Sequence, residues 1–418
     1  EFARILSDPS KAAIFWNATF DVHMFEAEGI RVKCKIVDAM LGNHLLYENE
    51  NGSTYGFPLK EMGVKYIDKA AAEYETALVE KIGGKANIHL ADAAEVRDYA
   101  CMDTELTWKL FLRAYHGLKS EGLLRIFDEL SEYVAATISM ERTGVLVDVG
   151  TVETALSVLD YEIARFRAAI AQHVGREDFN PGPNSKAVRE LFGRLPGEPC
   201  DKNFLEQHGS KEAEMILEYR AMSKLAGSFY RPFLEHRDAA GRIHPNIKLH
   251  GTVSGRPSCS SPNLQALPRA SGNGPMDAVR HAVIAPEGWT IVSFDWSQIE
   301  LRLLAHYTQD PNLMQAYTED LDLHQMTASF MSVDRDWAKR LNFGSVYGIG
   351  PSGFAKAARI SEAKAKEVLS KWHDTYPSVR RLHRACENKA KSQGFVSMWT
   401  GRRKRYDNDW ECPKAMSG

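Results

Sequence analysis

The strongest constraint on the fold of this chain is a short β-rich stretch that separates two long helical stretches. Apolar residues recur at three- and four-residue spacing in 123–140 and 152–174, which predicts a helical region there. Residues 240–300 are rich in turn formers and end in an expected strand at 290–294, after which helical periodicity returns. Residues 1–115 mix short apolar runs with helical patterns, as an α/β domain does. Over 418 residues, this alternation predicts a multidomain α/β and α+β protein.

Charge is distributed unevenly along the chain. The formal net charge is −3 at pH 7, yet residues 335–405 contain seventeen Lys and Arg against five Asp and Glu. This basic block contributes +12, so the remaining residues carry a net charge of −15. A strongly basic block on a mildly acidic protein predicts a polyanionic partner.

Cysteine usage and hydropathy exclude several classes of protein. The six cysteines are scattered and form no CxxC pair, which argues against a zinc site and against a disulfide framework. This usage suits a reducing compartment. No apolar run approaches the roughly 18–20 residues that a membrane-spanning helix needs, so we expect no membrane partner. We therefore expect a cytoplasmic protein, in a bacterium or in an infected host cell if the source is viral.

The run from Ser293 to Arg302 carries the most specific chemical signal. Asp295 stands at the end of the expected strand, where its carboxylate can face a cleft. Nucleotidyl transfer requires such acids, because two Mg²⁺ ions must bind the attacking hydroxyl and the triphosphate. Carboxylate oxygens are the hard ligands that Mg²⁺ prefers. An isolated Asp after a strand is more often a helix cap, so the neighbouring residues decide its meaning.

Four side chains recur at four-residue spacing further along: Arg335, Lys339, Phe343 and Tyr347. Each step of four residues turns a helix by about 400°, so the side chains drift only about 40° per step along one face. This face presents two cations and then two aromatic rings over a rise of roughly 18 Å. Cations suit phosphates, and rings suit a base and sugar, so the face predicts a nucleoside triphosphate site. Exposed bases and core aromatics would explain any one pair, but not all four residues together.

These runs resemble two motifs of the family A (DNA polymerase I-like) DNA polymerases. Residues 295–302 are similar to motif A almost residue for residue. Residues 335–348, with Asn-Phe-Gly at the centre, are similar to motif B, the nucleotide-binding fingers helix. Other segments match the family in the same order along the chain: 219–225 (a thumb helix), 252–258 with 261–265 (a primer and template contact), 323–328 (a fingers segment) and 401–403 (a turn). The resemblance spans roughly residues 15–418.

The resemblance implies a role for each matching residue. Asp295 would bind metal, and it forms the expected catalytic set with Glu300 and Lys339. Of the nucleotide-binding set, Arg335, Lys339 and His324 would grip the phosphates, and the two aromatic rings would shape the sugar and base pocket. Glu300 would crowd the ribose 2′ position. The full nucleotide-binding set is Gln298, Ile299, His324, Arg335, Lys339, Phe343 and Tyr347, and the expected DNA-binding set is Lys224, Arg256, Asn263, Gln265, Arg402 and Arg403.

The N-terminal region carries a second pair of matches. The run from Asn17 to Asp21 resembles the second motif of the four-carboxylate 3′–5′ exonucleases, and the run from Tyr99 to Asp103 resembles their third. Tyr99 and Asp103 are four residues apart and would share a helix face. In that family the Asp binds metal and the Tyr hydroxyl orients the attacking water. The resemblance thus implies a truncated RNase H-like exonuclease domain at 1–117.

Two expected motifs are not found in the sequence. No DxE run precedes Asn17, and no His-Asp-Glu run follows Gly401. The first exonuclease motif and motif C of the polymerase are therefore expected beyond the ends of the chain. Asp295 is then the one identifiable member of a two-aspartate metal site. We expect this segment by itself to be inactive, and the full-length parent to be the enzyme.

The resemblance implies a right-hand polymerase behind the exonuclease domain. Thumb and connecting helices would occupy 118–240, a palm part with motif A 241–305, and fingers with motif B 306–418. The implied activity is template-directed transfer of a deoxynucleotidyl group from a dNTP to a primer 3′-hydroxyl, with 3′–5′ proofreading, in DNA replication or repair. The implied cofactor is Mg²⁺, two ions per polymerase site.

The implied partners are primer–template DNA and dNTPs, and we expect a monomer. The thumb shows no large insertion of the kind that binds a processivity partner, so no clamp or helicase is identified. Two other functions fit part of the pattern. A single-subunit RNA polymerase shares the palm plan, but Glu300 would collide with a 2′-hydroxyl and the exonuclease motifs would stay unexplained. A non-catalytic DNA-binding descendant of a polymerase would share the motifs found here, and only a downstream His-Asp-Glu would exclude it.

Overall fold

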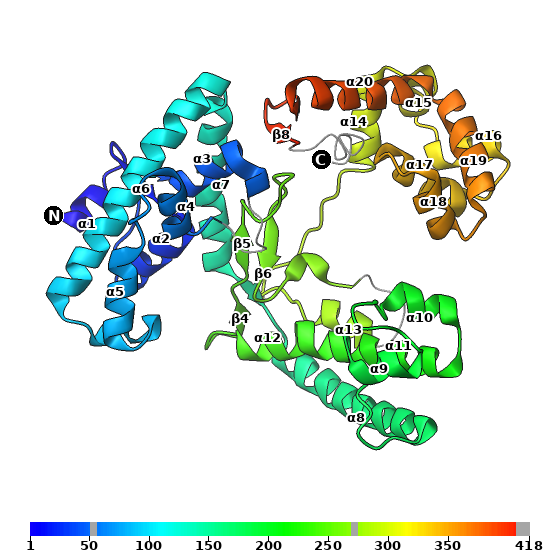
Figure 1. The fold of residues 1–418 in the computed structure, drawn as a ribbon, viewed down its shortest axis with the longest axis horizontal. Helices are drawn as coiled ribbons and strands as arrows, with labels where there is room; N and C mark the ends of the chain where they lie inside the picture. The colour runs from blue at the N-terminus through cyan, green and yellow to red at the C-terminus, as the bar shows by residue number, and fades with distance from the viewer. Residues whose placement is uncertain (51–56, 269–274, 407–418) are drawn as a thin grey trace. The chain divides into compact units, whose positions relative to one another are not determined.

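The computed structural model describes residues 1–50, 57–268 and 275–406, which form two compact units. The first unit contains Glu1–Val134, His250–Arg256 and the described part of Ser293–Gly418, and the second contains Ala135–Leu249 and the described part of Pro257–Val292. Helices dominate both units, and the described strands form four two-stranded sheets (Figure 1). None of the described helices is long and apolar enough to cross a membrane.

The N-terminal part of the first unit, blue to cyan in Figure 1, combines one parallel strand pair with a long helix. Strand β1 pairs with β2 in register from Ala12↔Lys35 to Phe15↔Asp38. This arrangement agrees with the α/β pattern expected for the first 115 residues. The elements are α1 (Phe2–Leu6), β1 (Ala12–Phe15), α2 (Ala18–Ala27), β2 (Lys35–Asp38), α3 (Ala39–Tyr47), η1 (Glu48–Glu50), α4 (Leu59–Tyr66), α5 (Glu73–Ile82), η2 (Lys85–Leu90), α6 (Ala93–Glu121) and the first half of α7 (Leu124–Thr143).

Close helix packing builds the core of this part. Leu110 of α6 is fully buried and packs with Met40 of α3 in one apolar cluster. Helix α4 approaches α6 closely at Gly63, where an added Cβ would lie 2.7 Å from the side chain of Leu106. Helix α6 ends at Gly122, whose φ of +71° suits glycine and whose N–H caps the last turn. The packed pair α3–α6 therefore forms a fixed base for residues that the sequence singled out on α2 and α6.

The C-terminal part of the first unit, yellow to red in Figure 1, is a group of helices followed by a hairpin. Its core contains the fully buried rings of Phe354, Trp372 and Tyr376. The antiparallel strands β7 and β8 pair from Phe395↔Arg405 to Ser397↔Arg403. The elements are α14 (Ile299–Thr308), α15 (Pro311–Thr318), α16 (Leu323–Met331), α17 (Arg335–Val346), α18 (Pro351–Ala358), α19 (Glu362–Thr375), α20 (Pro377–Gln393), β7 (Phe395–Ser397) and β8 (Arg403–Arg405).

The strand expected at 290–294 is absent, so this part of the prediction was wrong. Residues 289–296 have no regular secondary structure, and the side chains of Ile291 and Phe294 are 59% and 91% exposed. A strand exists only where its N–H and C=O groups meet a hydrogen-bonding neighbour. No described strand pairs with these residues. The apolar content of the segment was therefore not sufficient to make it a strand.

The second unit, green in Figure 1, is mostly helical. Asp148 caps α8 by accepting the N–H of Thr151 at 3.1 Å, and Phe233 and Tyr230 are fully buried against α8. Its elements are the second half of α7, β3 (Val145–Leu146), α8 (Val149–Val174), α9 (Lys186–Leu191), α10 (Lys202–His208), α11 (Lys211–Leu225), η3 (Ala226–Tyr230), α12 (Arg231–Glu235), β4 (Arg242–Ile243), β5 (Asn246–Lys248), β6 (Ser258–Ser260), η4 (Leu264–Ala266) and α13 (Pro275–His281).

Candidate functional site

Helix α17 forms where the four-residue spacing predicts a helix, and it presents the expected cations to solvent. Asp334 sets its start by accepting a hydrogen bond from the backbone N–H three residues on, at 2.8 Å. Arg335 and Lys339 are exposed, Phe343 is half-buried, and Tyr347 caps the end of the helix with its ring 39% exposed. The buried residues of the helix are Ala338, Leu341, Asn342, Ser345 and Val346. The helix therefore has one buried side and one accessible side.

Asp322 holds Arg335 at the start of this accessible side. One carboxylate oxygen of Asp322 accepts the backbone N–H groups of His324 and Gln325 at 2.9 and 3.1 Å and so caps α16. The other oxygen accepts from Nε of Arg335 at 2.7 Å. Burial raises the pKa of Asp322, but the hydrogen bonds from Arg335 and the helix N–H groups outweigh it, so the pKa lies below its usual value. In the described part of the chain, Lys339 has no ion-pair partner.

Glu300, Arg256 and Tyr347 meet at the aromatic end of the α17 face. They come from the first turn of α14, the loop before β6 and the end of α17. Arg256 donates to Oε1 of Glu300 at 2.6 Å, and the Tyr347 hydroxyl is hydrogen-bonded to both side chains. Burial and the bond to Glu300 raise the pKa of Tyr347, and the bond to Tyr347 raises that of Arg256. The carboxylate of Glu300, held by Arg256 and Tyr347, thus lies at the aromatic end of the α17 face.

The remaining residues of the 295–302 run lie just before α14 and in its first turn. Gln298 is the N-cap of α14 with φ +52°, and its Oε1 accepts from the hydroxyl of Tyr317 at 3.0 Å. Ile299 is 41% exposed. Asp295 is exposed in the irregular segment before the helix. Its oxygens suit Mg²⁺, but no three His, Cys, Asp or Glu side chains come together as metal ligands among the described residues, so Asp295 alone does not make a two-ion site.

His324 lies behind the accessible face rather than on it. Its side chain on α16 is 2% exposed, and its ring centroid is 5.7 Å from that of Phe343. Burial lowers the pKa of His324 below its usual value, so the ring is neutral near pH 7. Its Nδ1 is 3.0 Å from the side-chain nitrogen of Asn342, a residue for which the motif resemblance predicted no separate role.

The structure places the expected DNA-binding residues in three different settings. Lys224, on α11, and Arg256 are exposed. Asn263 accepts the backbone N–H of Gln265 at 3.1 Å, and Gln265 donates its side-chain nitrogen to the carbonyl of Pro257 at 3.2 Å. These two amides therefore shape their own loop, although both residues are exposed. Arg402 and Arg403 form the third setting.

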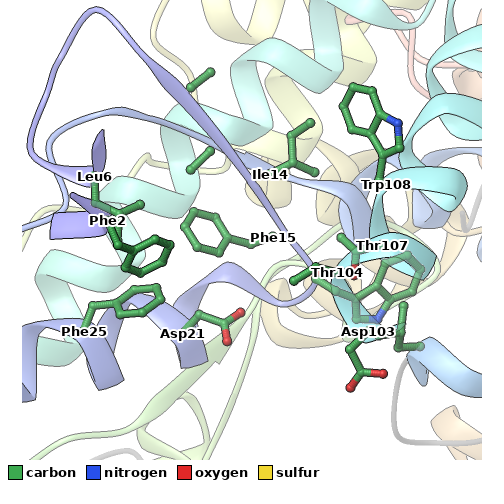
Figure 2. Close-up of a pocket in the computed structure, with 14 residues that line it drawn as sticks. Phe2, Leu6, Ile14, Phe15, Asp21, Phe25, Asp103, Thr104, Thr107 and Trp108 are labelled. Carbon is green, nitrogen blue, oxygen red and sulfur yellow. The ribbon is translucent and has the colours of Figure 1, made fainter. Parts of the chain in front are cut away.

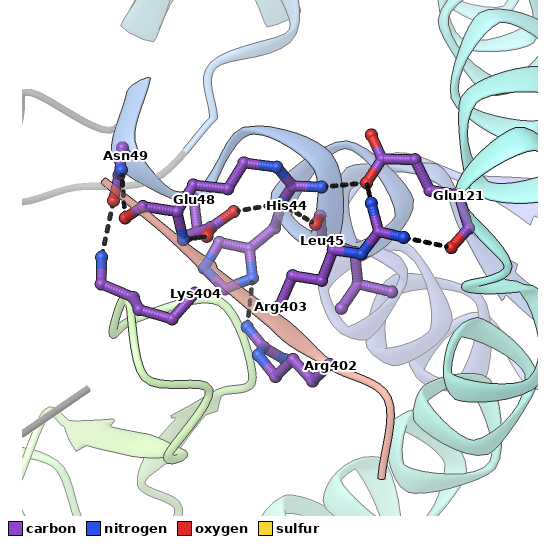
Figure 3. A network of polar contacts seen from close by, with 9 residues as sticks. His44, Leu45, Glu48, Asn49, Glu121, Arg402, Arg403 and Lys404 are labelled. Carbon is purple, nitrogen blue, oxygen red and sulfur yellow. Dashed lines mark hydrogen bonds and ion pairs between the residues drawn. The ribbon is translucent and has the colours of Figure 1, made fainter. Parts of the chain in front are cut away.

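Arg402 is buried just before β8, against the N-terminal part of the first unit (Figure 3). It is 7% exposed and donates to Nδ1 of His44 at 3.3 Å. Gly255, at φ +80°, leaves room for it, since an added Cβ would lie 2.5 Å from the guanidinium carbon. Burial, reinforced by the charge of Arg402, lowers the pKa of His44 to about 3.

Ion pairs hold β8 itself against the N-terminal part of the first unit (Figure 3). Arg403 donates to Glu121 at 2.8 Å, and Arg405 donates to Glu48 at 2.8 Å and also contacts Glu121. The Glu48 side chain is 1% exposed, so its charge requires the Arg405 partner. The basic hairpin is therefore held by carboxylates from η1 and α6.

A second candidate site lies in the N-terminal part, where Asp21 and Asp103 line one cavity of about 620 Å³ (Figure 2). Asn17 is the N-cap of α2 with φ +66°. Asp38 is buried behind it and accepts the N–H groups of Asn17, Ala18 and Met40 at 3.2, 2.9 and 3.0 Å. Burial raises the pKa of Asp38 to about 6, and burial with the neighbouring Asp38 charge raises that of Asp21 to about 6.

Asp103 already has a cation beside it. Lys60 is ion-paired with Asp103 and lies 3.6 Å from Glu75. Its ammonium is 4.1 Å from the ring centroid of Tyr74 and 4.8 Å from that of Tyr99, and the Tyr74 hydroxyl donates to Asp103 at 2.6 Å. Burial lowers the pKa of Lys60 to about 8. Tyr99 and Asp103 do share one face of α6, but a lysine occupies the space between them.

Sequence reasoning missed Asp38 and Lys60. Asp38 could have been found, because it ends an apolar run just before a helix, the same signal that singled out Asp295. Lys60 carried no signal, because its partner Asp103 lies far along the chain and no spacing rule connects them.

Comparison with known proteins gives one consistent group. The family described as DNA polymerase family A matches residues 151–413. DNA polymerase I of Treponema pallidum (strain Nichols) is 27% identical, over 97% of this chain and 42% of its own length. The thermostable DNA polymerase I of Thermus aquaticus is 32% identical over 73% of this chain and 39% of its own length. DNA polymerase DpoZ of Vibrio phage phiVC8 is 28% identical over 98% and 75%.

The chain spans less than half the length of these bacterial relatives. Among solved structures, the POL domain of Pol1 from M. smegmatis, in complex with DNA primer-template and dNTP, superimposes with a TM-score of 0.80. The match covers 99% of this chain and 73% of that one at 23% identity, so it establishes the fold alone.

Proposed function

Because this chain belongs to DNA polymerase family A, we propose that the whole protein synthesises DNA on a template, adding deoxynucleotides to a primer 3′-hydroxyl. The observation that carries the proposal is the accessible face of α17. There Lys339, which has no ion-pair partner among the described residues, is followed by an aromatic ring and then by the Glu300 cluster. Its order matches the order of a nucleotide: phosphates, sugar and base. Such an activity serves DNA replication or repair.

The phosphate end of the nucleotide would lie against Arg335 and Lys339. Asp322 orients the guanidinium of Arg335 and takes up part of its charge. Lys339 is exposed on the same face, and its ammonium forms no ion pair with any residue that the structure describes. Fixed cations stabilise the charge that moves onto the phosphate oxygens during transfer, and a preplaced group needs no reorganisation when the reaction occurs.

The sugar would be read by Phe343, Tyr347 and Glu300. Arg256 and Tyr347 hold the carboxylate of Glu300 in one position by hydrogen bonds. A carboxylate fixed in this way can exclude a 2′-hydroxyl, because it cannot move aside without breaking both bonds. This arrangement favours deoxynucleotides over ribonucleotides and so supports a DNA polymerase over an RNA polymerase.

Asp295 would provide a carboxylate to Mg²⁺, which in a bound pair activates the primer hydroxyl and neutralises the triphosphate. Among the described residues, no three His, Cys, Asp or Glu side chains come together as metal ligands around Asp295. We therefore propose Asp295 as a metal ligand of the whole protein and derive no geometry for the ion.

Primer–template DNA and dNTPs are the proposed partners. The solved POL domain of Pol1 from M. smegmatis that shares this fold was determined in complex with both. Of the proposed DNA contacts, Lys224 and Arg256 are exposed cations, and Arg256 shares its charge with Glu300. Asn263 and Gln265 are exposed as well. We propose that the protein acts as a monomer in the cytoplasm of a bacterium or of an infected cell, since the relatives are bacterial and phage proteins.

Proofreading is a second candidate function. Asp21 and Asp103 line one cavity, as two metal-binding carboxylates of a 3′–5′ exonuclease would. Asn17 and Tyr99 each lie four residues before one of these carboxylates, as the resemblance to the exonuclease motifs requires. Against this function, Lys60 supplies Asp103 with a positive charge from the protein itself. The polymerase function is therefore the better supported of the two.

Extension of a labelled primer by one nucleotide tests both functions in the whole protein. We expect Mg²⁺-dependent addition of the complementary dNTP, loss of addition in Asp295→Asn, and retention in Asp374→Asn, whose exposed carboxylate on α19 lies outside the site. Addition without regard to the template, or full addition by Asp295→Asn, would contradict the proposed polymerase. Incubation without dNTP tests proofreading, since shortening of the primer must then disappear in Asp103→Asn.

A further inference from the structure

A closed network of buried hydrogen bonds lies behind the accessible face of α17. At its centre is Asn342, the first residue of the Asn-Phe-Gly run, which is 1% exposed. The indole nitrogen of Trp372, on α19, donates to Oδ1 of Asn342 at 2.8 Å. Nδ2 of Asn342 lies 3.0 Å from Nδ1 of His324 and 3.0 Å from Oγ1 of Thr327, both on α16. Three helices therefore share one polar cluster.

The chemistry of the end groups fixes the orientation of the Asn342 amide in this network. An indole nitrogen can only donate, so it requires the oxygen of the Asn342 amide and turns the NH₂ group toward His324. Thr327 can give its own proton to the carbonyl of Leu323, at 2.9 Å, and accept from the hydroxyl of Tyr376 at 2.8 Å and from Asn342. With one hydrogen of the Asn342 NH₂ group directed to Thr327, the other meets an acceptor only if Nδ1 of His324 carries no proton. In the neutral ring the proton must be on Nε2.

We propose that Asn342 is a positioning residue that locks His324 in the neutral tautomer with its proton on Nε2. The inference rests on the function proposed above and deepens it, because it states in which form His324 serves the nucleotide site. The ring then stays neutral behind the face and adds no third positive charge to those of Arg335 and Lys339. The proposed role also explains why an asparagine occupies this buried position of α17.

Protonation of His324 would break the network. An imidazolium carries a proton on Nδ1, which would face the NH₂ group of Asn342, donor against donor. The other charged groups facing the ring are Asp322, which favours the imidazolium, and Arg335 and Lys339 from α17, which disfavour it. Burial is the largest influence, and it also favours the neutral ring. The hydrogen-bond network and the electrostatic surroundings therefore act in the same direction.

The test is a ¹⁵N spectrum of the 418-residue chain labelled in its imidazole rings. Ring nitrogens with and without a proton resonate in well separated regions, and the signals lost in His324→Gln identify this ring. We expect an unprotonated Nδ1 and a protonated Nε2 at pH 7, and the same form at pH 6, where a free histidine is largely charged.

Two substitutions should allow His324 to carry a proton on Nδ1, each by a different route. Asn342→Asp offers only acceptors, so Nδ1 of His324 should gain a proton and its pKa should rise by at least about one unit. Trp372→Phe removes the indole N–H, so the amide can rotate and both tautomers should appear; this variant also serves if Asn342→Asp does not fold. Ser345→Ala is the matched control, because Ser345 is a buried residue of the same helix whose hydroxyl has no hydrogen-bond partner in the described structure.

The control should leave the His324 signals unchanged. A proton on Nδ1 in the unaltered chain overturns the proposal, and so does an unchanged tautomer and titration in whichever of the two variants fold. The measurement needs neither substrate nor catalysis. The expected tautomer in a whole protein that extends no primer would therefore count against the proposed polymerase function alone, and a different tautomer in an active protein against the lock alone.

Discussion

Two segments of one basic block use their cations in different ways. In hairpin β7–β8, Arg403 is ion-paired with Glu121, and Arg405 is ion-paired with Glu48. On α17, Lys339 is exposed and has no ion-pair partner within the described residues. Both segments belong to the stretch 335–405, whose surplus of charge predicted a polyanionic partner. A count of charges predicts that a region is basic, but burial and pairing decide whether a cation is available to a ligand.

The difference separates binding from stability. A cation without an internal partner contributes its charge to a ligand, whereas a guanidinium paired with a buried carboxylate mainly prevents that carboxylate from being unpaired. Substitutions in the two segments should therefore affect different measurements.

The largest effect is expected for Lys339→Ala in the whole protein. Loss of one preplaced charge at the phosphates should lower kcat/KM for a dNTP by roughly 10²–10³-fold, measured by single-nucleotide extension. Urea unfolding should be nearly unchanged, because an exposed side chain without a partner contributes little stability.

Arg340→Ala is the control for this effect, since Arg340 is the next residue of the same helix and is also exposed. One residue turns a helix by about 100°, so Arg340 leaves the face that carries Lys339. Equal losses in the two variants would mean that α17 supplies only a general positive field, and the contrast with the hairpin would disappear.

The hairpin should show the opposite pattern in Glu48→Gln. The buried carboxylate accepts from the backbone N–H and the guanidinium of Arg405, both at 2.8 Å. Its neutral isostere leaves the Arg405 charge with a weaker partner and should lower the free energy of unfolding by about 2–3 kcal/mol. Primer extension by the folded whole protein should stay within about twofold of normal.

Glu129→Gln provides the comparison, because Glu129 pairs with Arg125 on the exposed surface of α7. Exposed pairs at this spacing contribute about 0.3–0.5 kcal/mol, so its unfolding free energy should hardly change. If the two Glu variants lose the same stability, the buried pairs do not hold the hairpin.

A smaller effect is expected for Glu300→Ala, which tests the carboxylate end of the α17 site. Removal of the side chain that Arg256 and Tyr347 hold in place should raise ribonucleotide incorporation relative to deoxynucleotide by roughly 10–200-fold. Competing single-nucleotide extensions measure this ratio. Glu362→Ala, at the exposed start of α19, should leave it unchanged. Unaltered discrimination in Glu300→Ala would favour a different residue as the gate.

The smallest effect concerns pH and His44 beside the hairpin. The folded pKa of His44 is about 3, below its unfolded value, so its stabilising contribution is present above about 6.5 and is lost as pH falls toward 3. Between pH 6.5 and 5.5 the chain should lose about 1 kcal/mol more unfolding free energy than His44→Gln does. Asp21 and Asp38, with raised pKa values, contribute with the opposite sign, and the difference between the two chains removes them.

Residues that act through local geometry could be predicted from the sequence. The four-residue spacing from Arg335 to Tyr347 predicted α17, because helix geometry alone places those side chains in one row. The family resemblance was confirmed for the same reason, since its motifs are contiguous runs. The domain boundaries and the roles of individual residues remain predictions.

Residues that act through distant partners could not be predicted. Glu121 lies 282 positions before Arg403, so no spacing rule indicated that this arginine is paired. The strand expected at 290–294 failed for a related reason, because a strand depends on a neighbour that its own sequence does not specify. His324 was found by its motif, but its hydrogen bond to Asn342 depends on how α16 packs against α17.

The pairing of Glu48 with Arg405 also has a consequence for synthesis on the ribosome. The two residues are 357 positions apart, and translation proceeds at about 5–20 residues per second. Roughly 20–70 s therefore pass between the synthesis of Glu48 and the addition of the arginine that pairs with it. During this interval the carboxylate of Glu48 has no Arg405 to pair with, so it stays hydrated in the nascent N-terminal part. The last strand described in the chain thus supplies the cation that the buried Glu48 of the N-terminal part requires.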